Sequence, residues 1–117
     1  MNAQSPSIDY LQTEIAVGES QRIRLVVRGE IDMGSAGLVR DAITNVLDAR
    51  PSELTIDMSA VGFCDLLGLV ALTSAADACR RDGIKLGIIG VSLPVRRAFE
   101  ISGLTSLLEP SGTDGRA

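Results

Sequence analysis

The stretch from residue 53 to residue 58 constrains the fold most, because it reads as a strand at the centre of a sheet. Its middle is apolar or β-branched, and acidic side chains occur only near its ends. A strand of this composition is typical of a sheet that helices cover on both faces. The chain is therefore predicted to fold as an α/β protein.

Six further segments are arranged around this strand. β-Branched runs and helical spacing predict strands at residues 12–17, 23–28 and 85–89, and helices at residues 35–49, 66–81 and 92–103. Residues 104–108 add a last short strand or helix. Strand–helix–strand units imply parallel crossovers, and the two opening strands imply a hairpin. We therefore predict a mixed sheet of four to five strands, in the order β-β-α-β-α-β-α, with helices packed against it.

The predicted helices have recognisable ends and apolar faces. The first is expected to be capped near Ser35 and to end before Pro51, and the second to stop at Gly83. The apolar face of the first helix is predicted to hold Leu38, Ala42, Ile43 and Val46. The apolar face of the second holds Leu66, Leu69, Val70, Leu72, Ala75, Ala76 and Cys79, and that of the third holds Val95 and Phe99.

Length and charge indicate one folded domain without affinity for polyanions. The 117 residues are 45% apolar and carry a net charge of −4, with no long Lys/Arg run. No stretch approaches the ~20 apolar residues that span a bilayer. We expect a cytoplasmic protein that binds neither nucleic acid nor a membrane. Its domain is expected at residues 11–109, between a flexible tail at 1–10 and a disordered tail at 110–117.

The absence of histidine removes most catalytic chemistry. Without it no Ser/His/Asp or Cys/His set can be built, and two cysteines are too few for a structural zinc site. The sequence has no Gly-rich loop with the lysine that cradles phosphate. We therefore expect no enzymatic activity, no metal and no cofactor.

The second predicted helix begins in an unusual way. Asp65 stands at the N-cap position, where a carboxylate accepts backbone N–H groups and the helix end favours added negative charge. A Ser or Thr just after it would be a natural phosphate site, but Leu66 and Leu67 follow instead. Gly68, in the first turn, costs about 1 kcal/mol relative to Ala, which indicates that another backbone comes close there.

Three motifs together resemble the STAS domain family over residues 12–108. They are G-E-I-D at residues 29–32, D-x-x-G-L at residues 65–69 and R-R-D-G at residues 80–83. The nearest branch is that of the bacterial anti-sigma factor antagonists. In those proteins two hydroxyl residues follow the Asp, and one of them is phosphorylated by the anti-sigma factor, which is itself a kinase. The unphosphorylated antagonist binds that kinase and frees the sigma factor.

The resemblance implies a partner-binding surface whose switch has been lost. The partner would be an anti-sigma factor of the serine-kinase type, and phosphorylation at the two usual positions is excluded by the leucines. We predict a regulatory protein, without catalytic residues, that controls sigma-factor-dependent transcription and stays ready to bind. The implied surface consists of Asp32, Cys64, Asp65, Leu66, Leu67 and Gly68.

Each of these residues also has a purely structural interpretation. Asp65 can serve only as a helix cap and Asp32 only to order a turn, and we expect one of the two leucines to pack inward and the other to be at least partly exposed. A helix N-terminus can activate the Cys64 thiolate for redox control, although a small buried apolar residue is the favoured interpretation. A disulfide with Cys79 is excluded, because roughly 20 Å of helix separates the two.

A second function fits the same residues. An accessory STAS subunit of a lipid-transport ATP-driven complex, or of a stress-signalling assembly, needs no phosphorylatable serine. A homodimer is also open, either through the first strand or through the leucine pair.

Overall fold

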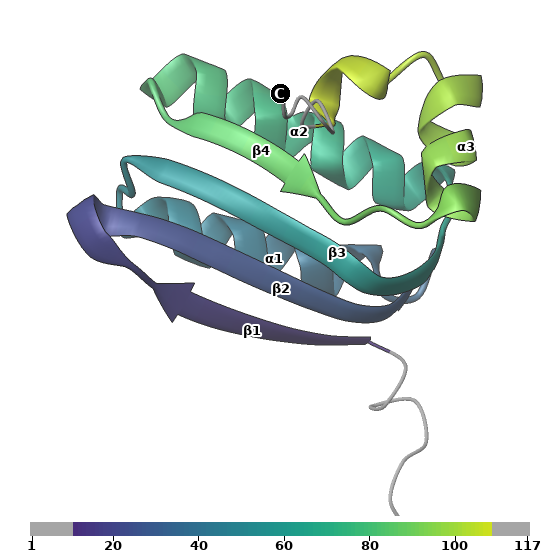
Figure 1. Cartoon of the computed structure of the whole chain (residues 1–117), viewed down its shortest axis with the longest axis horizontal. Coiled ribbons are helices and arrows are strands. Elements are labelled where there is room, and N and C mark those ends of the chain that lie inside the picture. The colour runs from purple at the N-terminus through teal and green to yellow at the C-terminus, as the bar shows by residue number, and fades with distance from the viewer. Residues whose placement is uncertain (1–10, 109–117) are drawn as a thin grey trace, which may run out of the picture.

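The computed structural model describes residues 11–108, which form a four-stranded sheet in the order β1-β2-β3-β4 (Figure 1). The predicted α/β class and element order are confirmed, and the tails predicted at 1–10 and 110–117 lie outside the described residues. The elements are β1 (Leu11–Val17), η2 (Glu19–Gln21), β2 (Arg22–Ile31), α1 (Ala36–Asp48), β3 (Glu53–Cys64), α2 (Leu66–Asp82), β4 (Lys85–Ile89), α3 (Leu93–Ile101) and η3 (Thr105–Leu107), where η marks a short 3-10 helix.

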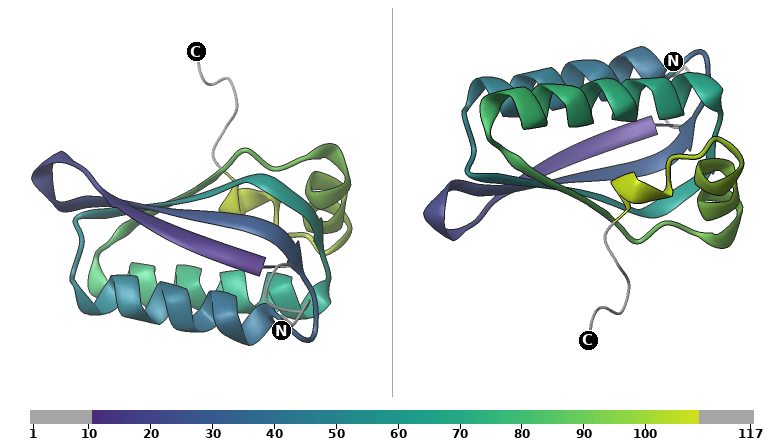
Figure 2. Two further views of the ribbon diagram at one scale, coloured as in Figure 1. Left: turned by 90° about the horizontal axis from the view of Figure 1, so that it is seen from below. Right: turned by 90° about the horizontal axis from the view of Figure 1, so that it is seen from above.

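The sheet is mixed, as the opening hairpin predicted. β1 runs antiparallel to β2, whereas β2, β3 and β4 are parallel to one another. Helices α1 and α2 lie side by side on one face, and α3 lies on the other face at one end only (Figure 2). The expectation that helices cover both faces of β3 is therefore only partly correct, because α3 reaches one end of the strand and leaves the rest of that face to polar side chains.

β3 is longer than the predicted strand and carries the chain directly to the start of α2. It extends to Cys64, and residues 60–64 continue the parallel pairing with β2 after two register shifts. Small and polar residues interrupted the apolar pattern that predicted an end at Met58. Ser59 lies inside the strand, and its hydroxyl donates to Asp57 Oδ1 at 2.5 Å.

The helices bury the residues that complete one aliphatic core. Ile43 and Val46 of α1 are buried as predicted, but Leu38 is exposed and Val39 is buried instead, because the face at helical spacing with Ile43 and Val46 passes through Val39. α2 ends at Gly83, whose φ of 72° closes the helix in the left-handed conformation. Val95 and Phe99 of α3 are buried as predicted. None of the helices in residues 11–108 is long and apolar enough to cross a bilayer.

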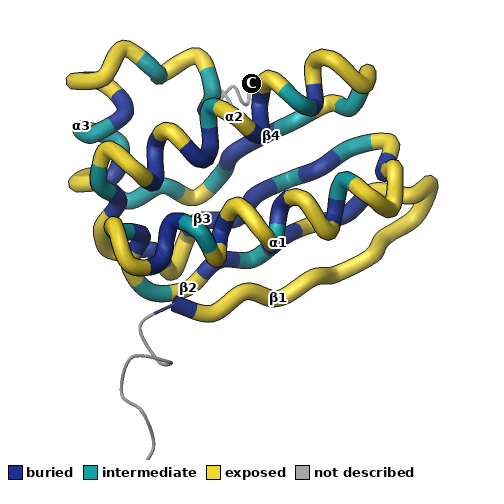
Figure 3. Tube along the Cα trace, turned by 180° about the vertical axis from the view of Figure 1, so that it is seen from behind, coloured by how far each residue is buried: buried dark blue, intermediate teal, exposed yellow. Residues whose placement is uncertain are grey.

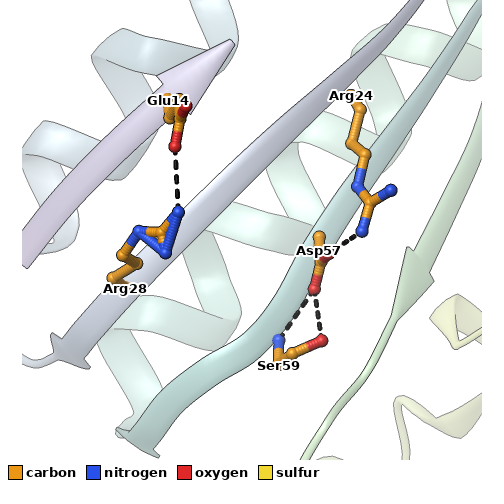
Figure 4. A network of polar contacts seen from close by, with 5 residues as sticks. All are labelled: Glu14, Arg24, Arg28, Asp57 and Ser59. Carbon is orange, nitrogen blue, oxygen red and sulfur yellow. Dashed lines mark hydrogen bonds and ion pairs between the residues drawn. The ribbon is translucent and has the colours of Figure 1, made fainter. Parts of the chain in front are cut away.

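The face of the sheet away from α1 and α2 carries a polar network (Figure 4). Asp57 is buried there and accepts from the Ser59 hydroxyl, the Ser59 backbone N–H and the Arg24 guanidinium. Burial raises the pKa of Asp57, but the hydrogen bonds from Ser59 and Arg24 outweigh it and lower the pKa to about 2. Arg28 pairs with Glu14 at 2.9 Å on the same face. The charges at the centre of this face therefore pair with one another, Arg24 with Asp57 and Arg28 with Glu14.

Candidate functional site

The neighbouring parallel strands β2 and β3 finish at the same end of the sheet. The residues that follow them, Asp32 and Asp65, are therefore side by side. Ile31, the last residue of β2, is the register partner of Cys64, the last residue of β3. The Asp65 N–H donates to the Ile31 carbonyl at 2.9 Å, which continues the pairing by one residue. Each aspartate therefore stands at the entrance to a helix, Asp32 before α1 and Asp65 before α2.

Asp65 is the N-cap of α2, as predicted. Its Oδ1 accepts from the Gly68 N–H at 3.1 Å, and its backbone has the extended conformation of a cap. The first two helical residues are Leu66 and Leu67, and their exposed fractions are 66% and 44%. The expectation that one of them packs inward is wrong. Both leucines precede Gly68 and Leu69, the first buried residues of α2, so the helix begins with two exposed side chains.

The predicted start of α1 near Ser35 is confirmed, since Ser35 occupies the N-cap position, but the side chain that orders this turn is that of Asp32. Its Oδ1 accepts from the N–H groups of Gly34 and Ser35 at 2.9 and 3.1 Å. Ser35 is fully buried and makes no cap bond with its side chain; its hydroxyl donates to the Glu30 carbonyl and accepts from the Asp32 N–H. The turn before α1 is therefore a closed set of local hydrogen bonds, in agreement with the structural interpretation of Asp32.

Gly68 and Cys64 support the surface from below and are not part of it. Both are buried, and a Cβ at Gly68 would lie 2.5 Å from Ile31 Cγ2 and 2.7 Å from Cys64 Sγ. The predicted close approach at Gly68 is correct, but side chains rather than a backbone make it. Since neither residue is exposed, we remove Cys64 and Gly68 from the predicted contact surface.

The environment of Cys64 does not favour a reactive thiolate. Burial, and next the charge of Asp65, raise the pKa of the Cys64 thiol to about 12. This is the opposite of the lowered pKa that the helix N-terminus suggested, so the basis of the redox hypothesis is gone. Cys64 and Cys79 are both free and buried, which matches the alternative interpretation of a small apolar core residue.

The structure adds two exposed apolar residues to the leucine pair that the sequence did not single out. Met33 lies in the turn before α1, and Val70, expected on the buried face of α2, is half exposed. Met33, Leu67 and Val70 line one groove of about 350 Å³ between the starts of α1 and α2. We call Met33, Leu66, Leu67 and Val70 the apolar patch.

One signal in the sequence could have revealed this patch. Met33 is a large apolar residue in a turn that is otherwise polar and glycine-rich, where no core contact is expected. Phe63, at the end of β3, is a further exposed apolar residue near the same edge of the sheet. Exposed apolar side chains beside two carboxylates offer contact area to another protein.

Comparison with known proteins identifies the fold and its relatives. The family model described as STAS domain matches residues 14–114. The chain is 30% identical over 105 residues to the anti-sigma-B factor antagonist of Listeria monocytogenes, covering 90% of this chain and 92% of that protein. It is 32% identical over 80 residues to the anti-sigma-F factor antagonist RsfB of Mycobacterium tuberculosis, covering 68% and 65%. The crystal structure of an anti-sigma factor antagonist from Mycobacterium paratuberculosis superposes with a TM-score of 0.79 at 28% identity, covering 94% of this chain and 92% of that one.

Proposed function

The chain belongs to the STAS domain family, and we propose that it acts as an anti-sigma factor antagonist that docks on an anti-sigma factor of the serine-kinase type. Its relatives at 30% and 32% identity carry the name of antagonists of anti-sigma-B and anti-sigma-F factors. These are regulatory binding proteins rather than enzymes. By occupying the anti-sigma factor, the protein would release a sigma factor and so control transcription.

The observation that carries the proposal is the exposure of both leucines at the start of a capped helix. An apolar side chain contributes about 25 cal/mol for each Å² that a partner removes from water. Leu67 lines one groove with Met33 and Val70, and Leu66 is exposed next to it, so a partner that covers the apolar patch buries several apolar side chains at once. Asp32 and Asp65 flank this area, and their carboxylates can pair with cations of the partner.

The same two leucines make the interaction permanent. A phosphate at this helix start would add nearly two negative charges and break an apolar contact by desolvation and repulsion. Leucine has no hydroxyl to accept a phosphoryl group. The protein therefore remains competent to bind whether or not its partner is an active kinase, and its control lies in its amount or in the partner.

The experiment is a binding titration against the kinase-type anti-sigma factors encoded near this gene. The unmodified protein is expected to form a stable complex, and the double variant Leu66→Ala with Leu67→Ala to bind at least about tenfold more weakly. Ile101→Ala is the matched control, since Ile101 is 87% exposed on α3, outside the patch. Equal affinity of the double variant and the control would place the contact elsewhere, and no complex with any such factor would reject the function.

A further inference from the structure

The outer edge of β1 is open, in contrast to the other edge of the sheet. All of β1 except Leu11 is exposed (Figure 3). At the opposite edge, Leu108 forms a parallel bridge with Ile88 of β4 and covers part of that strand. Among residues 11–108, nothing pairs with the outer side of β1. Its backbone N–H and C=O groups on that side are therefore available to another strand.

β1 also exposes apolar side chains on the face that carries the core. Thr13, Ile15 and Val17 are the register partners of Val27, Leu25 and Ile23, which are all buried under α1 and α2. Ile15 and Val17 are nevertheless 49% and 72% exposed, because the helices do not extend over the edge strand. We call Thr13, Ile15 and Val17 the β1 strip.

An edge strand that remains single is usually protected by lysine, proline or a bulge, and β1 has none of these. Its one charged residue, Glu14, points to the other face and is paired with Arg28. The β1 strip consists of β-branched residues at alternate positions, which are the side chains that pack best across paired strands. The edge is therefore built for pairing rather than for solvent.

We propose that the occupant is a second copy of this chain, whose β1 pairs antiparallel with β1 about a two-fold axis at Ile15. The axis sets Ile15 against the partner's Ile15, and Thr13 against the partner's Val17 on either side of it. The two sheets then join into one of eight strands. A groove of about 290 Å³ beside Thr13, lined by Leu11, Leu38 and Ala42, lies where the partner's Val17 enters.

Charge complementarity favours this register over an axis at the neighbouring Glu14. An axis at Glu14 would set two carboxylates directly opposite each other, which destabilises a strand pair. With the axis at Ile15, the partner's Glu14 lies opposite Ala16, whose neighbour on β2 is Arg24. The small alanine leaves room between the guanidinium and the carboxylate, whose Cα atoms are then roughly 10 Å apart. Arg24 is half exposed and retains free donors beyond its bond to Asp57.

The dimer leaves the apolar patch of each copy free, since no residue of β1 belongs to the patch. The assembly would present two docking surfaces, and a partner that is itself dimeric would gain affinity from binding both. The contact is limited to one strand and its neighbours, so the dimer is expected to be weak and dependent on concentration.

Sedimentation velocity on the full chain over a wide range of concentration tests the proposal. The unmodified protein is expected to shift from monomer to dimer, and Ile15→Lys to raise the dimer Kd at least about tenfold, because two ammonium groups meet at the axis. Ile101→Lys, at an equally apolar and more exposed position on α3, should dimerise like the unmodified protein. Leu66→Asp should also leave the dimer unchanged, which separates this contact from the apolar patch.

A cross-linking experiment fixes the register. Ile15→Cys is expected to form an intermolecular disulfide on mild oxidation, whereas Gln12→Cys should not, because the two Gln12 positions are about 20 Å apart in this register. Preferential cross-linking of Gln12→Cys, a monomer at every concentration, or a dimer that Ile15→Lys does not weaken would each overturn the proposal. The cysteine pair gives a result even if the lysine variant folds poorly.

Discussion

The starts of α1 and α2 are built on the same plan but end in different surfaces. Both follow a parallel strand, both begin with an aspartate whose Oδ1 accepts backbone N–H groups, and both have a glycine in the first turn. At α1 the hydrogen bonds close on themselves around buried Ser35. At α2, Asp65 accepts a hydrogen bond from the Gly68 N–H, and the side chains of Leu66 and Leu67 are exposed to solvent.

We infer from this difference that the aspartates stabilise the helix starts, whereas the leucines after Asp65 form the proposed contact surface. Asp65 caps α2 and Asp32 closes the turn before α1, so both aspartates are explained by their local hydrogen bonds. Exposed leucines at a helix start have no such explanation, because they contribute nothing to the core. The predictions below test this separation, beginning with the largest expected effect.

Placing charge on the α2 start should abolish docking without unfolding the protein. Leu66→Asp combined with Leu67→Asp is expected to weaken binding of the anti-sigma factor at least 100-fold, or about 2.7 kcal/mol, because a partner would have to bury two unpaired carboxylates. Acidic residues in the first turn suit the helix dipole, so the unfolding midpoint should not fall. Leu93→Asp, at the exposed start of α3, is the matched control. If the double variant and Leu93→Asp weaken binding equally, a charge at any exposed apolar position has the same effect, and the apolar patch is not the docking site.

Asp57 should make the largest contribution to the loss of folding stability at low pH. The variants at the two helix starts should therefore be compared above the pH at which Asp57 is protonated. Its pKa is lowered from 3.8 to about 2 in the folded protein. A lowered pKa stabilises the fold above pH 4, by up to about 2 kcal/mol, and this contribution is lost as the pH falls from about 4 to 2. Urea unfolding of the unmodified protein and of Asp57→Asn should differ by a constant amount above about pH 5 and converge below it. A difference that persists at pH 2 would mean that the carboxylate charge does not stabilise the fold.

The two glycines should respond in opposite ways to the same change. Gly68→Ala is expected to lower the free energy of unfolding by about 1–2 kcal/mol, because the clash with Ile31 and Cys64 exceeds the gain in helix propensity. Gly37→Ala, in the first turn of α1, meets only the end of the Arg40 side chain at 3.5 Å and should raise it by roughly 0.5–1 kcal/mol. Chemical denaturation measures both. A stabilised Gly68→Ala would show that the first turn of α2 can move away from β2 and β3.

The fold could be read from the sequence to a large extent because its signals are local. The bounds of β4, the stop of α2 at Gly83 and the buried pair Val95 and Phe99 all follow from spacing and from glycine or proline at helix ends. The end of β3 could not be predicted, since Ser59 and Gly62 break the pattern while pairing with β2 keeps the strand going. Tertiary pairing overrides propensity there.

The candidate site was predictable at its caps and not at its surface. Asp65 caps the helix and Gly68 leaves room for close packing, and both requirements are visible in the D-x-x-G-L motif. Leu67 and Val70 lie on the side of α2 that faces away from the sheet, and an almost continuous apolar run gave no polar positions from which that side could be identified. The sequence left open whether Cys64 is a reactive thiolate or a buried apolar residue, and the structure decides for the second, since burial raises the pKa of its thiol.

The smallest expected effect separates the two roles of the aspartates. Asn caps a helix about as well as Asp, so Asp65→Asn and Asp32→Asn should each change the free energy of unfolding by less than about 0.5 kcal/mol. If the carboxylates pair with cations of the anti-sigma factor, each variant should still bind several-fold more weakly, with a shallower dependence on salt. Isothermal titration at two ionic strengths, beside urea unfolding, measures both quantities. Unchanged affinity in both variants would restrict the docking surface to the apolar patch and leave the aspartates as caps alone, whereas a loss confined to Asp65→Asn would assign the electrostatic contact to the start of α2.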